Sequence, residues 1–274
     1  MDANIVAMSQ SSIFRRSLIL PAEHGSWSWL LVPYLLGAAV AGRFTFATLL
    51  VLLGGLSIFL MRQPATAWLR VRQGKGRRSD GPLAAGWTIG LGLLGVLSLA
   101  GLLALGHDEL LLLGAPLALV MAAYLFIALQ RRAQLRSLGM EIAGAVALAV
   151  TAPAAYAAGT GELDQIAWML WLLAGLMDGL GVLYVRRRIA DTHQRDGDRL
   201  GQLVLHVAGL VVVLLLAWRG LAPWLAVLPF VGLLARSAWA ARAARPVLNM
   251  KRFGFTEVGV ELVSAFFVAL GYWL

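Results

Sequence analysis

Cysteine is absent from this chain of 274 residues, and charged residues make up only 14% of it. The lack of cysteine excludes disulfide bonds and thiolate metal sites. The scarcity of charge excludes an ordinary soluble domain, in which about a quarter of the residues are charged. Acidic residues are rarer than basic ones: the chain has 14 Asp and Glu and 23 Lys and Arg, which gives a formal net charge of +9.

Long apolar runs fill most of the sequence, which is 60% hydrophobic with a mean hydropathy of +0.78. A helix needs about 20 apolar residues to cross a bilayer. By this measure the sequence predicts an all-α, polytopic transmembrane bundle of about nine spans, forming a single domain over residues 1–274. The spans are expected at 25–42, 44–62, 82–105, 109–130, 137–157, 165–187, 200–218, 222–240 and 256–274.

The basic residues gather on one side of these predicted spans. All but Arg43 and Arg219 lie before the first span, in every second break between spans or near the span ends that border those breaks, whereas the other breaks carry acids such as Asp108 and Glu162. Positively charged loops stay in the cytoplasm during insertion. We therefore expect a bacterial cytoplasmic (inner) membrane protein with a cytoplasmic N-terminus and an outside C-terminus. Membrane lipids are the expected partners of the basic residues, and no nucleic acid is expected.

Ionisable residues inside the spans are candidates for a site, because burial in lipid is costly unless they face a partner or a cavity. Asp178 lies about nine residues from Arg187 and could meet His206 of the next span. Glu257 and Glu261 share one face of the last helix and could hold a cation or pair with arginines from elsewhere. The alternatives are structural: a hydrogen-bonded helix contact for Asp178 and His206, and a favourable helix dipole for Glu257.

Glu23-His24-Gly25 precedes the first span and is followed by Trp27 and Trp29. The tryptophans are typical of anchors at the membrane interface. A histidine beside a carboxylate can titrate near neutral pH, so Glu23 and His24 are candidate catalytic residues together with Asp178. A solvated helix start with an acidic first turn explains the same residues without catalysis.

Two long loops on the basic side carry the remaining candidates. Loop 63–81 and its flanks hold Arg62, Arg70 and Arg72, whose guanidinium groups match phosphate or diphosphate oxygens. With Arg187, His206 and Glu261 they form the expected substrate-binding set. Topology alone accounts for two or three of the six basic residues in this region.

Loop 188–199 holds Asp191, Asp196 and Asp198 in a chain that is poor in acids. Oxygen-rich clusters bind Mg²⁺ through one or two carboxylates and the phosphates of a substrate, so these aspartates are candidate Mg²⁺ ligands. Exposed loop carboxylates would contribute little to stability. The alternative is an i, i+4 pair of Arg187 with Asp191 and ordinary loop solvation.

Nine spans with long loops after the second and sixth resemble the UbiA superfamily of intramembrane prenyltransferases. In that family, Asp-rich motifs in these two loops bind Mg²⁺ and the diphosphate of a polyprenyl donor. Arg186–Gly201 looks like the second motif, and Ser79-Asp80-Gly81-Pro82-Leu83 looks like the end of the first loop. The Asp-rich start of the first motif is replaced by Arg62-Gln63-Pro64. The resemblance implies a UbiA-like fold with Mg²⁺ and a prenyl diphosphate as ligands.

A closer resemblance is to the YwiC-like family of membrane proteins. It rests on Glu23-His24-Gly25-Ser26-Trp27, on Pro33-Tyr34-Leu35-Leu36-Gly37 and on Arg252-Phe253-Gly254-Phe255-Thr256-Glu257.

Three functions fit these observations. The first is an enzyme acting on an isoprenoid or lipid diphosphate at a basic cytoplasmic cavity. The others are a non-catalytic membrane assembly or accessory protein, and a transporter with Asp178, His206, Glu261 and Glu141 along a polar path.

Overall fold

The structure is a computed structural model that describes residues 24–130, 137–195 and 197–274, with side chains from Ser26 onward. Its helical elements, in chain order, are η1 (His24–Trp27), α2 (Ser28–Ala41), α3 (Phe46–Arg72), η2 (Arg78–Asp80), α4 (Gly81–Ala104), α5 (Leu110–Gln130), α6 (Leu138–Leu148), α7 (Thr151–Thr160), α8 (Gln165–Thr192), α9 (Arg199–Trp218), η4 (Trp224–Ala226), α10 (Val227–Arg242) and α11 (Met250–Trp273). No strand occurs in the described ranges.

Within the described residues, eight helices are long and apolar enough to cross a membrane, and α2 is a shorter apolar helix. In this count η2 with α4, α6 with α7, and η4 with α10 each make one spanning helix. The prediction of an all-α bundle with about nine apolar helices is confirmed. The protein is a multi-pass membrane protein.

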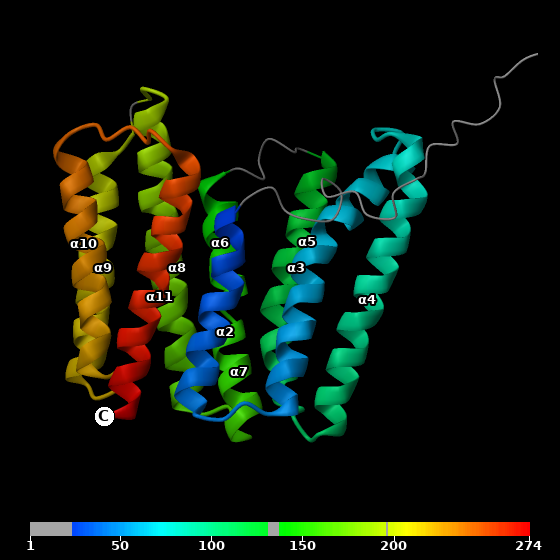
Figure 1. Ribbon diagram of the computed structural model, residues 1–274, viewed down its shortest axis with the longest axis horizontal. Coiled ribbons are helices and arrows are strands. Elements are labelled where there is room, and N and C mark those ends of the chain that lie inside the picture. The colour runs from blue at the N-terminus through cyan, green and yellow to red at the C-terminus, as the bar shows by residue number, and fades with distance from the viewer. Residues whose placement is uncertain (1–23, 131–136, 196) are drawn as a thin grey trace, which may run out of the picture.

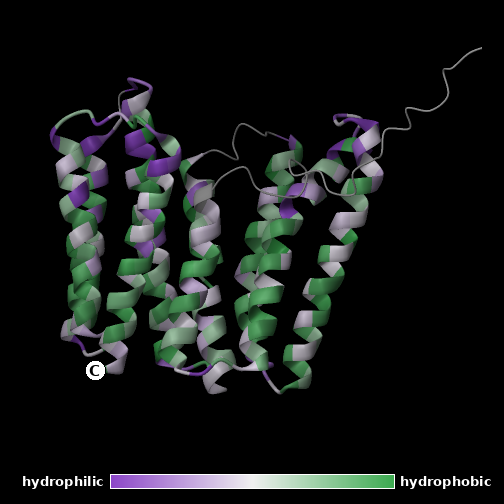
Figure 2. Ribbon diagram, viewed as in Figure 1, coloured by the Kyte–Doolittle hydropathy of each residue, from purple (hydrophilic) through white to green (hydrophobic). Residues whose placement is uncertain are grey.

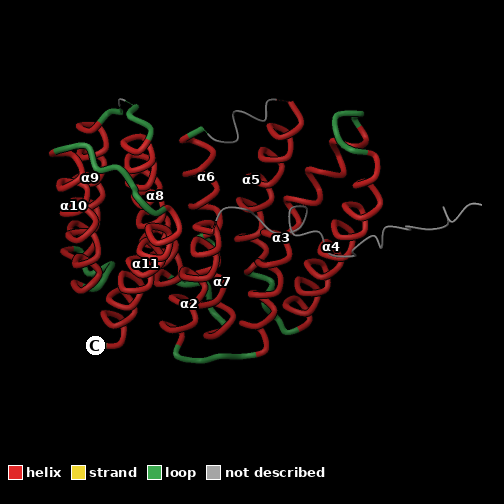
Figure 3. The backbone as a smooth tube through the Cα atoms, turned by 45° about the horizontal axis from the view of Figure 1, so that its top comes forward, coloured by secondary structure: helices red, strands yellow, loops and turns green. Residues whose placement is uncertain are grey.

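The helices run side by side, and the described connections lie at the two ends of the bundle (Figures 1 and 3). The connections after α3, α8 and α10 lie at one end, where hydrophilic residues are concentrated (Figure 2). We call this the basic end, because Arg70, Arg72, Arg195, Arg242 and Arg245 lie there. The C-terminus lies at the opposite end (Figure 1). Among the described connections, the predicted alternation of basic and acidic loops therefore matches the two ends of the fold.

The predicted loop boundaries at the basic end were wrong by as much as ten residues. α3 continues through Arg62 to Arg72, α8 continues to Thr192, and α11 begins at Met250 instead of at 256. A hydropathy window ends at the first charges, but Arg and Lys are good helix formers and the helix continues beyond the apolar run. Arg62, Arg70 and Arg72 consequently lie on a helix and not in a loop.

The predicted span 137–157 is not one continuous helix, because it breaks at Ala149 and Val150 between α6 and α7. Pro153 has no N–H to donate to the carbonyl of Ala149, four residues earlier, and this favours a break. The amide of Val150 donates to Ala147, one residue short of its α-helical partner Val146. Trp171 of α8 donates its indole N–H to the Val146 carbonyl over 2.9 Å and so replaces the missing partner.

The buried core lies along α8, which packs with α2, α6, α7, α9, α10 and α11. Its apolar members include Leu170, Leu173 and Phe230, each at most 1% exposed. α4 and α5 are mostly exposed and carry apolar side chains there, as expected for helices that face lipid. The core is therefore thickest in the half of the bundle that contains α8 and α11.

Candidate functional site

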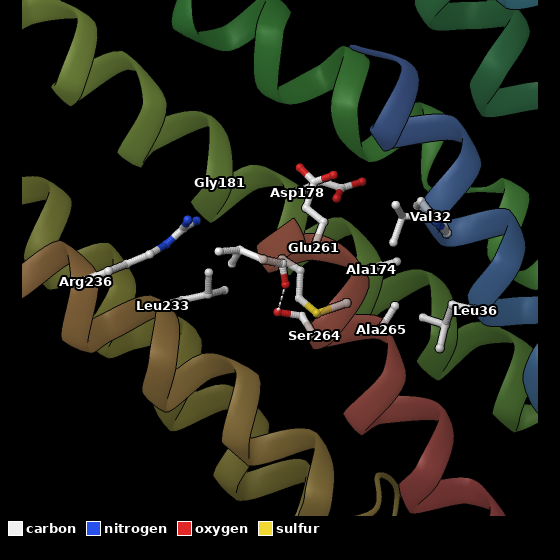
Figure 4. Close-up of a pocket in the computed structure, with 13 residues that line it drawn as sticks. Val32, Leu36, Ala174, Asp178, Gly181, Leu233, Arg236, Glu261, Ser264 and Ala265 are labelled. Carbon is white, nitrogen blue, oxygen red and sulfur yellow. Dashed lines mark hydrogen bonds between the residues drawn. The ribbon is translucent and has the colours of Figure 1, made fainter. Parts of the chain in front are cut away.

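Two carboxylates meet in the interior of the bundle, on helices far apart in the sequence. Asp178 lies near the middle of α8 and Glu261 near the middle of α11, and their carboxyl groups lie next to each other (Figure 4). Asp178 is only 3% exposed. One oxygen of each group, Asp178 Oδ2 and Glu261 Oε2, is buried without a hydrogen-bond partner in the described residues. Such unpaired buried oxygens are costly and indicate a site that takes a ligand or a proton.

The space beside these carboxylates is small and mostly apolar. Its lining comes from α2, α8, α10 and α11 and is completed by Val32, Pro33, Leu36, Ala174, Met177, Gly181, Leu233, Arg236, Val260, Ser264 and Ala265. The free volume of this cavity is about 10 Å³. That is room for about one water molecule. The hydroxyl of Ser28 is hydrogen-bonded to Glu261.

Arg236 brings a positive charge from α10 to the edge of this space. Its Nη1 donates to Glu257 Oε2 over 2.6 Å, and both side chains are mostly buried, with exposed fractions of 16% and 13%. Glu257 is one helical turn before Glu261 on the same face of α11. The site therefore combines three carboxylates and one arginine inside an apolar bundle, and only Glu257 has a charge-paired hydrogen bond.

Polar residues continue along the same face of α11 toward the opposite end. The series is Glu257, Glu261, Ser264 and Tyr272, with the fully buried Val268 between the last two. The Tyr272 hydroxyl is buried without a partner in the described residues. At that end Tyr156 donates to Asp164 Oδ2 over 3.1 Å. Tyr272 lies close enough to this pair to interact with it electrostatically.

A layer of arginine and aromatic side chains covers the site at the basic end. Arg188 donates to the Tyr184 hydroxyl over 2.7 Å and lies 5.3 Å from the ring centre of Trp239. Arg245 lies 4.2 Å from the same ring, and Arg188 also donates to the Arg245 carbonyl. Guanidinium groups stacked on aromatic rings gain cation–π stabilisation. The layer contacts the site through Tyr184, whose ring centre lies 4.3 Å from the Arg236 guanidinium carbon.

Asp191, a candidate metal ligand, lies at the centre of a buried network of ion pairs and hydrogen bonds at the end of α8, which we call the Asp191 network. Its Oδ1 pairs with Arg187, four residues earlier, and lies 3.6 Å from Arg199 Nη2. Its Oδ2 accepts from the backbone N–H of Arg245 over 2.8 Å. Arg187 also donates to the Gly197 carbonyl. The carboxylate thus joins α8, the start of α9 and the segment before α11.

Asp198 caps α9, since its Oδ1 accepts from the Gly201 N–H over 2.7 Å. Asp196 lies outside the described residues. The described part of the chain contains no group of three or more Asp, Glu or His side chains able to hold a metal ion. Because Asp191 and Asp198 already have protein partners, the donors present here do not fit the expected Mg²⁺ site.

Arg62, Arg70 and Arg72 lie apart from the carboxylate pair. Arg62 approaches Ser26 at 3.4 Å, lies over the rings of Phe59 and Tyr124, and keeps a buried Nε without a partner in the described residues. Arg70 donates to the Lys75 carbonyl, and Arg72 stacks on Trp68. These arginines do not form one cluster with Arg187, which lies in the Asp191 network.

The other predicted site residues are scattered. His206 is buried on α9, and its Nδ1 donates to the Gln202 carbonyl of its own helix. Glu141 pairs with Arg186 at 2.9 Å across α6 and α8. Glu23 lies outside the described residues, as does the side chain of His24, whose backbone begins η1. The fold therefore unites Asp178 and Glu261 without bringing His206, Glu141 or Arg62 to the same small space.

Two members of the site were not identified from the sequence. Arg236 counted only as one of the basic residues of the positive-inside pattern, and Ser28 was not singled out. Arg236 could have been identified from its position inside the predicted span 222–240, because a charge within a membrane span needs a partner. The predicted pairing of the Glu257 face with an arginine from elsewhere points to the same contact.

The sequence of this chain is similar to that of one known protein family. A model of the YwiC-like protein family matches residues 20–156, half of the chain. This protein belongs to the YwiC-like family. The uncharacterized protein YwiC of Bacillus subtilis (strain 168) is 27% identical over 178 residues, which cover 65% of this chain and 70% of that protein. No solved structure gives a significant match.

The residues matched by the family model contain Glu23-His24 and Arg62 but not Asp178 or Glu261. The stretch Arg252–Glu257, on which part of the resemblance rested, also lies outside them. The family is thus established from the first half of the chain, whereas the carboxylate pair lies in the second half.

Proposed function

We propose that this YwiC-like protein moves a small cation through the bilayer and that Asp178 and Glu261 hold the cation midway. The observation that carries this proposal is the pair of adjacent carboxylates, each with an unpartnered buried oxygen, near the middle of two spanning helices. Carboxylates inside a membrane are expensive, and they mark ion or proton pathways.

Further support comes from the surroundings of the pair. Polar groups continue on α11 on both sides of Glu261, toward Glu257 and toward Tyr272. Two of the helices around the site, α2 and α10, contain prolines in or near their first turns, Pro33 and Pro229. In this proposal the protein lies in the bacterial cytoplasmic membrane with its basic end in the cytoplasm.

The test is ion flux in liposomes that contain the purified full-length protein. A membrane potential is imposed, and internal dyes report pH and Na⁺ separately. We expect a protein-dependent flux of one of these cations, abolished by Asp178→Asn and by Glu261→Gln. Glu162→Gln, which changes an exposed acid at the opposite end, serves as the matched control and should retain the flux. Equal flux in protein-free liposomes, or wild-type flux in both site variants, would falsify the proposal and favour an accessory protein.

A second candidate is binding of an isoprenoid or other lipid diphosphate at Arg62. Its support is the buried, unpartnered Nε of Arg62, together with the half-buried guanidinium near Ser26 and Tyr124. Arginine donates in a fork that matches phosphate oxygens. No step is assigned to Mg²⁺ here, because Asp191 and Asp198 have other partners. Mg²⁺ stays a prediction that depends on Asp196.

Binding of farnesyl diphosphate to the detergent-purified protein tests this second candidate, with and without Mg²⁺. Arg62→Gln should weaken binding by about tenfold or more, since a hydrogen bond to a charged group contributes about 1.5–3 kcal/mol. Arg43→Gln, at the opposite end, should bind like the wild type. No binding by the wild type, or equal binding by both variants, would rule out a diphosphate site at Arg62.

A further inference from the structure

The identity of the cation can be argued from what the site offers it. Hard metal cations in proteins surround themselves with about six or more oxygen atoms. The described polar groups here are the two carboxylates and the hydroxyls of Ser28 and Ser264, and the Ser264 hydroxyl donates to the Val260 carbonyl of its own helix. The other lining side chains are apolar apart from Arg236, and the free space holds about one water. The site is therefore short of both ligands and room for a metal ion.

The charges that face the pair point to the same conclusion. Arg236 of α10 is the cation that lines the site beside the pair; it forms an ion pair with Glu257 and also attracts Glu261. Ser28 adds a hydrogen bond to Glu261. Burying a net charge in an apolar interior is costly. These contacts favour one ionised carboxyl, on Glu261, whereas Glu261 would repel a second negative charge on Asp178.

The remaining elements around the pair add no compensating charge. α2 contributes only apolar residues to the lining, adds the Ser28 hydrogen bond to Glu261, and contains no charged residue. His206 of α9 is buried and held through Nδ1 by the Gln202 carbonyl, so it keeps a fixed orientation in its own helix. Two adjacent like charges in a dry site cannot both ionise easily, and such pairs titrate together.

We infer that Asp178 and Glu261 carry a single proton between them, and that this proton is the cation that the protein moves. The inference rests on the proposed function, since it names the ion. One oxygen of each carboxyl is buried without a partner in the described residues, but Glu261 is the one that Ser28 hydrogen-bonds and Arg236 attracts, so the proton resides on Asp178. Transfer breaks the O–H bond of Asp178 and forms one on Glu261 Oε2, so one negative charge stays on the pair throughout.

Infrared spectroscopy of the full-length protein tests this, because a protonated carboxylic acid has a carbonyl stretch distinct from that of a carboxylate. At neutral pH the wild type should show one such band, and it should disappear as the pH is raised. Asp178→Asn should lose the band, because Glu261 then ionises beside Ser28 and Arg236. Glu261→Gln should retain it, and the exposed-acid variant Asp108→Asn should be unchanged.

Replacing choline by Na⁺ at constant ionic strength should leave the band unaltered. A band removed by Na⁺, a band absent from the wild type at neutral pH, or a band retained in Asp178→Asn would each overturn the inference. These outcomes are separate from those of the flux experiment. Na⁺ flux without the band would contradict the proton and keep the cation site, and the band without any flux would support the protonated pair and contradict transport.

Discussion

Gly37 of α2 and Ala152 of α7 make a contact that admits no side chain, because a Cβ on Gly37 would lie 2.0 Å from the Ala152 carbonyl oxygen. The obstacle is backbone, which cannot rotate away as a flexible side chain can. This contact fixes α2 against α7 and thereby sets where Ser28 and Val32 lie beside the carboxylate pair.

Gly37→Ala should destabilise the protein by about 1–3 kcal/mol, the usual cost of overpacking a well-packed interior. Thermal unfolding in detergent measures the effect. Gly90→Ala on α4 is the matched control, since a Cβ there meets nothing within 4 Å. Alanine favours a helix over glycine by about 1 kcal/mol, so the control should be neutral or slightly stabilised. Equal melting temperatures for both variants would contradict the close crossing.

Trp171→Phe should weaken the broken helix by removing the indole N–H that serves the Val146 carbonyl. An unsatisfied buried carbonyl costs about 1–3 kcal/mol. Trp168→Phe, on the same helix with its ring 6.0 Å away and 38% exposed, is the control and should have a smaller effect. Thermal unfolding compares the two, and an equal or greater loss in Trp168→Phe would refute this role for Trp171.

Asp191→Asn and Arg187→Gln should each destabilise the protein strongly, because the Asp191 side chain is only 1% exposed and its pair is buried. Breaking one partner of a buried pair costs about 3–5 kcal/mol. The double variant should lose less than the sum of the single losses, since the two residues are coupled. Unfolding of all three variants and of the exposed control Asp108→Asn provides the comparison. Normal stability of Asp191→Asn would instead favour a role as a ligand.

Single cysteines test the topology cleanly, because the native chain contains none. Ser79→Cys at the basic end should be protected from a membrane-impermeant maleimide in intact cells and labelled after the membrane is opened. Asp108→Cys and Leu274→Cys, at the opposite end, should be labelled in intact cells. The positive-inside rule gives this orientation. The reverse pattern would place the basic end outside the cytoplasm and contradict the proposed orientation.

The spans were predictable because hydrophobic length is a local property. The runs that became α4, α5 and α9 were located to within a few residues. The helix ends at the basic end were not, as Arg72 and Thr192 show, because a helix continues past the apolar run wherever its residues favour it. The break at Ala149 was missed although Pro153 is visible in the sequence, because proline in a membrane helix is often tolerated without a break.

The sequence also identified Asp178 and Glu261 as costly residues, each for its own span. It assigned Asp191 to an exposed loop, where the structure has a buried ion pair in the last turn of α8. Residues four apart on a helix are neighbours, so this pair was visible as an alternative once the helix was known to extend that far.

The sequence by itself determined the membrane class, the number of apolar helices and the concentration of positive charge at one end, because each depends on the composition of a contiguous segment. Only the tertiary structure decided which ionisable residues meet. Asp178, Arg236 and Glu261 come from three helices, and a contact between them depends on how α8, α10 and α11 pack. In lipid that packing follows from close fits such as Gly37 against Ala152, since apolar burial gives little preference among helix faces. Hydropathy could therefore predict the helices but not their partners.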